Sequence, residues 1–507
     1  MAQLPPAVTL AQIRAMSHRP EELMMRACPK TLVLSFTLST AAAQGFTFDY
    51  EPTAPEVVLD TDSTLITPKN GAPMLITGGV FVFRSVRIPP GVTVRAKGSR
   101  PMVWIVATSF LVEGTLSARG ADGQSALTLN SANFPTLGGA PGPAGGRGGN
   151  GSPNVFATSL FGESGQGPVG LFAPGGAGGL FTCISSCGRA SGGGGGAFAT
   201  AGDPYYATKR SGTSFVQQLG QGGYGCNGSS GAGSRSLSGG APGVRPFQDG
   251  RNDNDFFGVG IDLSRRIVIR GELPSLYGGA GGGGGGDLSS VCGFNPNFYS
   301  DNRGGGGGGG GGVLAIVSLG SIQVAASGVI DASGGHGGGG ELAGSNTAGA
   351  GGGGGSGGLI YLQAQSVQLH MHGETYARQD YSFCLAADGG ASLQGAFGGV
   401  SITGKYPPKP AALLDSAPTG GFGGLGVIQI VVPPGIANAD LTNTILDDNI
   451  TLFRNGLPIA GAEKQRFLAW RGFPNASGVW VDDFGNPTAI GDNEGDMRPS
   501  PILLPWL

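Results

Sequence analysis

The chain has 507 residues, of which 102 are glycine, only 12% are charged, and the formal net charge is −3. This balance excludes a basic nucleic-acid-binding protein and offers no polybasic patch for a membrane surface. Because glycine buries no side chain and loses the most backbone freedom on ordering, we expect no uniformly close-packed enzyme. A hydrophobic content of 39% is nevertheless too high for a fully disordered polar chain, so core-forming segments are expected.

The first predicted element is a secretory leader at residues 25–43. Met25–Lys30 is a basic start, Thr31–Thr40 is an apolar run, and Ala41–Ala43 are small residues before Gln44. This is the pattern of a signal peptide cleaved after Ala43. We interpret residues 1–24 as a misassigned start; the alternative is a buried strand or helix at 31–40. We therefore expect a secreted or cell-surface protein with no membrane span after cleavage.

Residues 44–124 are predicted to be strand-rich, because short β-prone runs alternate there with Gly, Pro, Asp and Asn. The runs are Val57–Leu59, Leu65–Thr67, Leu75–Thr77, Val80–Phe83, Val86–Ile88 and Val92–Val94.

A short repeat follows the pattern aliphatic-x-Ala-x-Gly. It occurs at Val94–Gly98, Leu116–Gly120 and Ile330–Gly334, and apolar runs precede the last two copies at equivalent distances. Short strands with a period near 20 residues are typical of a solenoid, whose units must stack to bury their inward faces. The predicted fold class is all-β, a parallel β-helix-like solenoid; a β-sandwich remains the alternative.

Residues 125–312 are expected to form a glycine-rich insertion, and residues 313–436 to continue the solenoid with further glycine runs. Gly304–Gly312, for example, leads directly into the apolar run Val313–Val317. The runs are either flexible loops or polyproline-II-like segments whose backbones pack side by side, with buried backbone groups paired. Their placement against apolar strands favours ordered packing.

From residue 437 to 507 glycine becomes less frequent and tryptophan appears at Trp470, Trp480 and Trp506. We expect a small C-terminal β module or a cap of the solenoid, because solenoids need protected ends.

Five cysteines follow the leader: Cys183, Cys187, Cys226, Cys292 and Cys384. An odd number in an exported protein allows at most two internal disulfides, and the sequence leaves their pairing open. A zinc site is not expected, because Cys183 and Cys187 have no matching second pair. His370 and His372 alternate on one face of a predicted strand, which is more typical of a solvated face than of a metal site.

Acidic clusters are the candidate calcium ligands, since calcium prefers oxygen. They are Asp249–Asp255 and a second group of Asp482, Asp483, Asp492, Glu494 and Asp496. Neither group has EF-hand spacing, and solvated turns fit both better than a site. Gly399–Lys405 has the spacing of a phosphate-binding loop, but Tyr406 and two prolines follow it, which excludes the required helix. Asp331 and Asp388 lie near strand ends without an identifiable catalytic partner, so we expect no enzyme and no cofactor.

The tracts Gly175–Gly179 and Gly278–Gly282 resemble the PGRS regions of mycobacterial surface proteins. The pattern of glycine run, apolar strand and Gly-x-Ile-x-Ala-x-Gly-Gly resembles uncharacterised glycine-rich secreted or surface proteins of Gram-negative bacteria. This resemblance implies an exported structural or cell-surface protein and supplies no catalytic residue.

Two alternatives remain open. One is an adhesin or carbohydrate-binding β-solenoid, with Tyr205, Tyr206 and Trp470 stacking on sugars; the other is a polysaccharide-acting β-helix enzyme. The partners expected are cell-surface glycans or further copies of the chain, and not nucleic acid.

Overall fold

The computed structural model describes the chain in segments, and all regular elements in them are β-strands. The described residues are 46–126, 136–152, 161–169, 175–179, 192–199, 206–210, 213–217, 240–244 (without 242), 259–262, 267–270, 275–286, 303–340, 342–344, 347–348, 350–371, 384–390, 420–433, 449–461, 464, 473–474, 480–481 and 501–505. Within these segments there is no helix long and apolar enough to cross a membrane. The all-β prediction is therefore confirmed for the described part of the chain.

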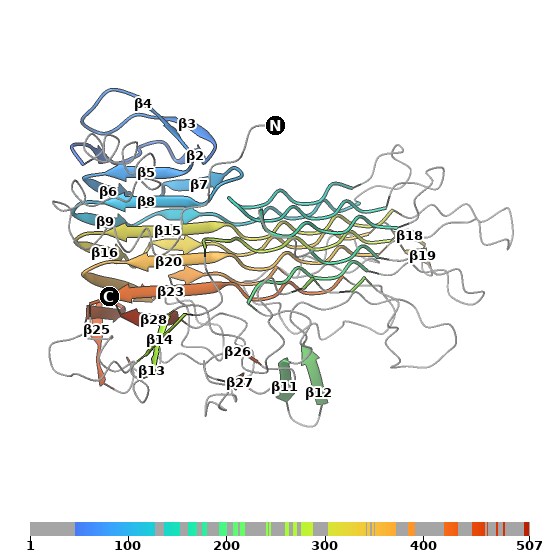
Figure 1. The fold of residues 1–507 in the computed structure, drawn as a ribbon. Coiled ribbons are helices and arrows are strands. Elements are labelled where there is room, and N and C mark those ends of the chain that lie inside the picture. Colours follow the sequence, from blue (N-terminus) through green and yellow to red (C-terminus); the bar gives the residue numbers. More distant parts are fainter. Residues whose placement is uncertain are drawn as a thin grey trace, which may run out of the picture.

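Three sheets built on parallel pairing, which we call together the strand stack, hold most of the strands (Figure 1). The first sheet has the order β28-β23-β20-β15-β8-β5, the second β1-β6-β9-β16-β21-β24-β25, and the third β2-β7-β10-β17-β22. The first sheet contains β5 (Val80–Phe83), β8 (Met102–Val106), β15 (Val313–Ser318), β20 (Leu359–Gln363), β23 (Val427–Val432) and β28 (Pro501–Pro505). The second contains β1 (Asp49–Tyr50), β6 (Ser85–Ile88), β9 (Ser109–Val112), β16 (Ser321–Val324), β21 (Ser366–Met371), β24 (Ile450–Arg454) and β25 (Leu457–Ile459). The third contains β2 (Glu56–Asp60), β7 (Thr93–Lys97), β10 (Thr115–Ser117), β17 (Val329–Asp331) and β22 (Leu385–Ala386).

The chain visits the three sheets in a repeating order. β5, β6 and β7 lie in the first, second and third sheet, and the same order recurs in β8–β10, β15–β17 and β20–β22. The sequence repeat lies in register across neighbouring strands, because Leu116 pairs with both Val94 and Ile330. Equivalent residues of successive repeats thus stack on one another in the third sheet.

A continuous apolar core lies between the sheets. Its N-terminal part is aromatic: the Trp104 ring, which is fully buried, stacks on Phe81 with ring centroids 4.7 Å apart and meets Phe110 edge-on at 5.6 Å. Towards the later strands the core becomes aliphatic, with Ile316, Leu362 and Ile430 all buried. Burial of these side chains provides the main stabilisation of the strand stack.

The first sheet is buried on both faces, whereas the second and third sheets alternate. All residues of β8, β15, β20 and β23 are buried. The outer face of this sheet forms a second apolar cluster with Phe198 and Leu276, which come from the glycine-rich part of the chain. Parallel strands that are covered on both faces have nearly continuous apolar sequences. This explains why the segments that follow the glycine runs are apolar at nearly every position.

The two ends of the strand stack are closed by hairpins. At one end the hairpin of β3 (Ser63–Ile66) and β4 (Met74–Thr77) buries Ile66, with Ile76 packed against the core. At the other end Asn455 and Gly456, both with positive φ, form the two-residue turn between β24 and β25. The edge strand β28 begins and ends with proline, which cannot donate a ladder hydrogen bond and so limits further pairing.

Four more two-stranded antiparallel sheets are described. They pair β11 (Tyr206–Arg210) with β12 (Thr213–Gln217), β13 (Val259–Asp262) with β14 (Ile267–Arg270), β18 (Leu342–Gly344) with β19 (Thr347–Ala348), and β26 (Phe473–Pro474) with β27 (Trp480–Val481).

Candidate functional site

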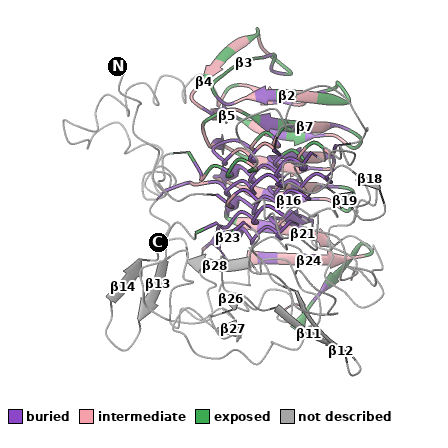
Figure 2. Cartoon of the chain, turned by 90° about the vertical axis from the view of Figure 1, so that its right-hand side faces the viewer, coloured by how far each residue is buried: buried purple, intermediate pink, exposed green. Residues whose placement is uncertain are grey.

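The glycine-rich segments lie side by side as a bundle that projects from the strand stack (Figure 1). We call it the glycine bundle; its members are residues 118–126, 136–142, 145–152, 161–169, 175–179, 192–199, 240–244, 275–286, 303–312, 332–340, 350–358, 387–390 and 420–426. Figure 2 faces the end of this bundle, and its closely spaced zigzag traces are mostly coloured as buried. The bundle is thus packed, although its interior consists almost entirely of backbone.

The backbone hydrogen bonds of segment 303–312 repeat every three residues. The amides of Gly306, Gly309 and Gly312 donate to segment 118–126, those of Gly307 and Gly310 to segment 145–152, and those of Gly305, Gly308 and Gly311 to segment 350–358. A three-residue turn without internal hydrogen bonds is the geometry of a polyproline II helix. The three faces of this segment therefore donate to three different neighbours.

The carbonyl groups of the same segment bond to three further neighbours. Gly139, Gly282 and Gly335, from segments 136–142, 275–286 and 332–340, donate to the carbonyls of Gly307, Gly308 and Gly309. Segment 303–312 is therefore surrounded by six others. Segments 275–286 and 350–358 also have six hydrogen-bonded neighbours each, so these three form the centre of the bundle.

The number of neighbours accounts for the glycine content of each segment. Segment 303–312, with six neighbours, is glycine from Gly304 to Gly312, and a Cβ on Gly309 would come closer than 3.0 Å to the carbonyl of Ala140. Segment 332–340 has four neighbours and tolerates a side chain at every third position, as in Ser333 and His336. Segment 118–126 has three neighbours and keeps glycine only at every third position. At the margin, side chains therefore occur where no neighbouring backbone occupies the space. The central glycine runs 278–286 and 351–358 contain only the small residues Ala280 and Ser356, and the Ser356 hydroxyl accepts a hydrogen bond from the Ala280 amide at 2.8 Å.

The bundle continues the hydrogen bonding of two sheets. Ala118 and Gly120, which follow β10, donate to Asp331 and Ser333, which end and follow β17. On the incoming side, the amide of Leu359 at the start of β20 donates to Gly312, just before β15. Strands in a sheet lie about 4.8 Å apart, so the sheets set the spacing at which the bundle segments begin.

Polar side chains cap amides at the margin of the bundle. The carboxylate of Asp122 accepts from the amide of His336 at 2.8 Å, and the hydroxyl of Ser125 accepts from Gly339 at 3.0 Å. The amide oxygen of Asn150 accepts from Gly138 at 2.9 Å, and Glu163 accepts from Asn150 at 3.1 Å. Among the described residues, no neighbouring backbone carbonyl accepts from these amides at the margin of the bundle, so the side chains accept their hydrogen bonds instead.

Most segments of the bundle that run away from the strand stack are followed in the chain by a segment that runs back towards it. The turn from one to the other occurs at the end of the bundle far from the strand stack. The described chain ends there on either side of residues 127–135, 153–160, 180–191 and 287–302. Residues 341–349, which contain β18 and β19, join two further segments at the same end. Their sequences differ from the bundle: residues 287–302 alone contain Phe294, Phe298 and Tyr299 among Asn and Ser. The bundle thus holds the ends of several chemically varied connections close together.

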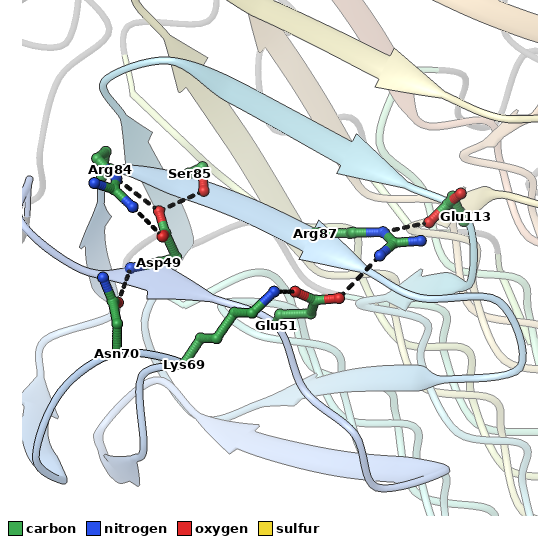
Figure 3. A network of polar contacts seen from close by, with 8 residues as sticks. All are labelled: Asp49, Glu51, Lys69, Asn70, Arg84, Ser85, Arg87 and Glu113. Atoms are coloured by element: carbon green, nitrogen blue, oxygen red, sulfur yellow. Dashed lines mark hydrogen bonds and ion pairs between the residues drawn. The ribbon is translucent and has the colours of Figure 1, made fainter.

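Charged side chains on the second sheet pair with one another at its N-terminal part (Figure 3). Arg84 pairs with Asp49, and Lys69 pairs with Glu51. Arg87 bridges Glu51 at 3.0 Å and Glu113 at 2.7 Å. The hydrogen bond from Arg84 holds the pKa of Asp49 below its usual value, and that from Lys69 lowers the pKa of Glu51. These carboxylates are stabilised as anions and poorly suited to general-base chemistry.

Of the residues singled out in the sequence, the structure brings Asp331 and Asp388 close together at the root of the bundle. Asp331 accepts a hydrogen bond from the amide of Ser333 at 2.9 Å, and the Ser333 hydroxyl accepts from the amide of Asp388 at 3.2 Å. Ser333 thus links the carboxylate of Asp331 to the backbone of Asp388. Burial lowers the pKa of the nearby His336. In the described part of the chain no three His, Cys, Asp or Glu side chains are grouped as metal ligands.

The remaining candidates are only partly described. Cys384 is buried in the core directly before β22, and His370 stacks on Phe453 with centroids 4.3 Å apart. The other four cysteines, His372, the phosphate-loop-like segment 399–405, Tyr205, Trp470, and the calcium candidates Asp249–Asp255, Asp482, Asp483, Asp492, Glu494 and Asp496 lie outside the described residues, as does the leader.

The capping residues were not predicted from the sequence. A spacing of three was the available signal: Asp122 and Ser125, Arg147 and Asn150, and Glu163 and Gln166 each stand three apart in the glycine-rich part of the sequence. No family model matches the chain, and no curated protein and no solved structure matches it either.

Proposed function

We propose that the protein is an exported structural or cell-surface protein: a parallel β-helix-like solenoid from which a polyproline-II bundle extends as a rigid arm. The observation that supports this proposal is the hydrogen bonding of the central segment 303–312, whose backbone groups bond to six neighbouring segments. A backbone held on all sides, with no side chain that can change rotamer, suits a mechanical role. The run Gly304–Gly312 carries no side-chain group for chemistry.

The leader at residues 25–43 supports an extracytoplasmic location. The adjoining strand stack supplies the apolar burial that stabilises a bundle made of backbone. The prolines of β28 and the capped margin of the bundle limit association with other chains. These are features expected of a scaffold that must persist in solution outside the cell.

Expression of the full chain in a Gram-negative host tests the location. We expect the exported fraction to contain a protein whose N-terminal residue is Gln44, measured by intact mass and N-terminal peptide analysis. Recovery of the uncleaved chain from the cytosol, with a folded strand stack, would refute the proposed location.

An adhesin is the second candidate, favoured by the ends of the described segments that lie close together at the far end of the bundle and are joined by sequences of varied chemistry. Rigid scaffolds that carry varied loops are a common way to build binding surfaces, and Tyr, Ser and Asn are frequent in such loops. The test replaces residues 287–302 with a glycine-serine linker of equal length and compares binding of the exported protein to bacterial cell surfaces. Unchanged binding, or none in either protein, would exclude this connection as an adhesive element.

A further inference from the structure

The outer face of the second sheet carries ladders of like side chains. Ser321 pairs in register with Ser109 on one side and with Ser366 on the other. Two residues further along, Gln323 pairs with Gln368. All five are partly exposed and project on the side of the sheet opposite the apolar core, because they alternate with buried residues. The strand spacing of about 4.8 Å repeats each hydroxyl or amide regularly along the face.

These polar groups are available to a ligand. The side chains of Ser109, Ser321, Ser366, Gln323 and Gln368 make no hydrogen bond to any described residue. Each hydroxyl can donate and accept, and each amide has two donors and an acceptor. This contrasts with the bundle margin, where side chains of the same kind are occupied by neighbouring amides.

The ladder region of the face is nearly uncharged. The acidic and basic side chains lie on β6 and around β1 and β9, where they neutralise one another (Figure 3). From β16 to β24 the outward positions are Ser, Gln, Thr, His and Phe, with Arg454 only at the end of β24. Burial lowers the pKa of His370, so its imidazole is neutral near pH 7.

An aromatic pair borders the ladders. The rings of His370 and Phe453 are stacked with an interplanar angle of 8°, and both side chains are partly exposed. Stacked rings next to hydroxyls and amides combine an apolar surface with hydrogen-bonding groups. A polymer that has both C–H faces and hydroxyl groups at regular spacing complements such a surface.

We propose that an uncharged polysaccharide binds across the outer face of the second sheet, from β9 to β24. The absence of unpaired charge on the ladders among the described residues argues for a neutral glycan over a uronate polymer, which would require exposed cations. The inference rests on the proposed location outside the cell, where such polymers occur.

The test measures binding of the exported full chain to neutral glucans and galactans and to uronate polymers by affinity electrophoresis and calorimetry. We expect at least one neutral glycan to bind with an affinity that does not change between low and high ionic strength. The double variant Gln323→Ala with Gln368→Ala should weaken that binding about tenfold, because it removes two amide contacts. Arg95→Ala, on the third sheet, is the matched control and should leave binding unchanged.

Three outcomes would overturn the proposal: no neutral glycan is retained, binding is confined to charged glycans and falls with salt, or the double variant binds as tightly as the natural chain. Conversion of a dimer to a monomer by the double variant, seen by light scattering, would assign the face to a second copy and also overturn it. A cytosolic, uncleaved chain that still binds a neutral glycan would refute the proposed location but leave the binding face intact.

Discussion

The strand stack and the glycine bundle are continuous in hydrogen bonding, yet they are stabilised by opposite means. In the strand stack, side chains such as Trp104 and Ile316 fill the space between sheets. In the bundle, the backbones of neighbouring segments fill that space themselves, and a side chain would not fit. The comparison teaches that hydrogen-bonded segments can pack around a core of side chains or directly backbone against backbone, and that glycine permits the second arrangement.

The largest expected effect follows from removing volume in the strand stack. Trp104→Ala deletes a fully buried ring that contacts Tyr50, Phe81 and Phe110. We expect the free energy of unfolding to fall by about 3–5 kcal/mol, because a cavity remains. Denaturant unfolding followed by circular dichroism measures this change. A loss below about 1 kcal/mol would show that the aromatic cluster is not the core of this region.

Adding volume is the corresponding test in the bundle. Gly309→Ala places a methyl group against the carbonyl of Ala140, and we expect a loss of about 1–3 kcal/mol despite the lower backbone entropy of the unfolded alanine chain. Ala140→Ser, at an exposed position of the margin, should change stability by less than about 0.5 kcal/mol. Both are measured by denaturant unfolding. Equal stability of the two variants would contradict the close packing around Gly309.

Capping at the bundle margin should have a smaller effect. Asp122→Ala removes the acceptor of the His336 amide, and we expect a loss of about 1 kcal/mol together with faster hydrogen exchange at that amide. Asp122→Asn keeps an acceptor oxygen and should preserve most of the protection. Gln166→Ala, at an exposed margin position, is the control. If Asp122→Asn exchanges as fast as Asp122→Ala, the ion pair with Arg119 and not the cap protects the amide.

The sequence was sufficient to predict the strands and the repeat, because those depend on side chains. Val94, Leu116 and Ile330 were recognised as equivalent residues, and they stack in register. The run Val313–Val317 was recognised as a strand, and the continuous burial of β15 explains why it does not alternate.

The arrangement of the bundle was beyond prediction for a physical reason. A glycine run presents the same amides and carbonyls at every residue, so nothing in Gly304–Gly312 specifies which segments will surround it. That choice follows from the sheets at one end and from the few side chains at the margin, such as Asp122 and Asn150. The ladders of Ser and Gln on the outer face of the second sheet were not predicted, because they appear only when strands far apart in the sequence, such as β9 and β16, pair.

The smallest expected effect is that of low pH on stability. It should differ between the two regions, because the paired charges described on the second sheet belong to the strand stack. The pKa values of Asp49 and Glu51 are lowered on folding from ordinary values of 3.8 and 4.5. Their contribution to stability is therefore complete above about pH 5 and is lost as the pH falls through the lowered folded values. The cations of both pairs are at least half exposed to solvent, so we expect only a small decrease in the urea midpoint between pH 7 and pH 3.

Arg84→Ala with Lys69→Ala removes the two cations that lower these pKa values, and the variant should lose part of this pH dependence. Amide exchange in the central segments of the bundle, corrected for the intrinsic effect of pH, should not change with the acid step, because these segments contain no Asp, Glu or His. A bundle that loses protection before the strand stack does would show that its stability depends on these charges. The two regions would then be coupled through the sheets from which the bundle segments extend.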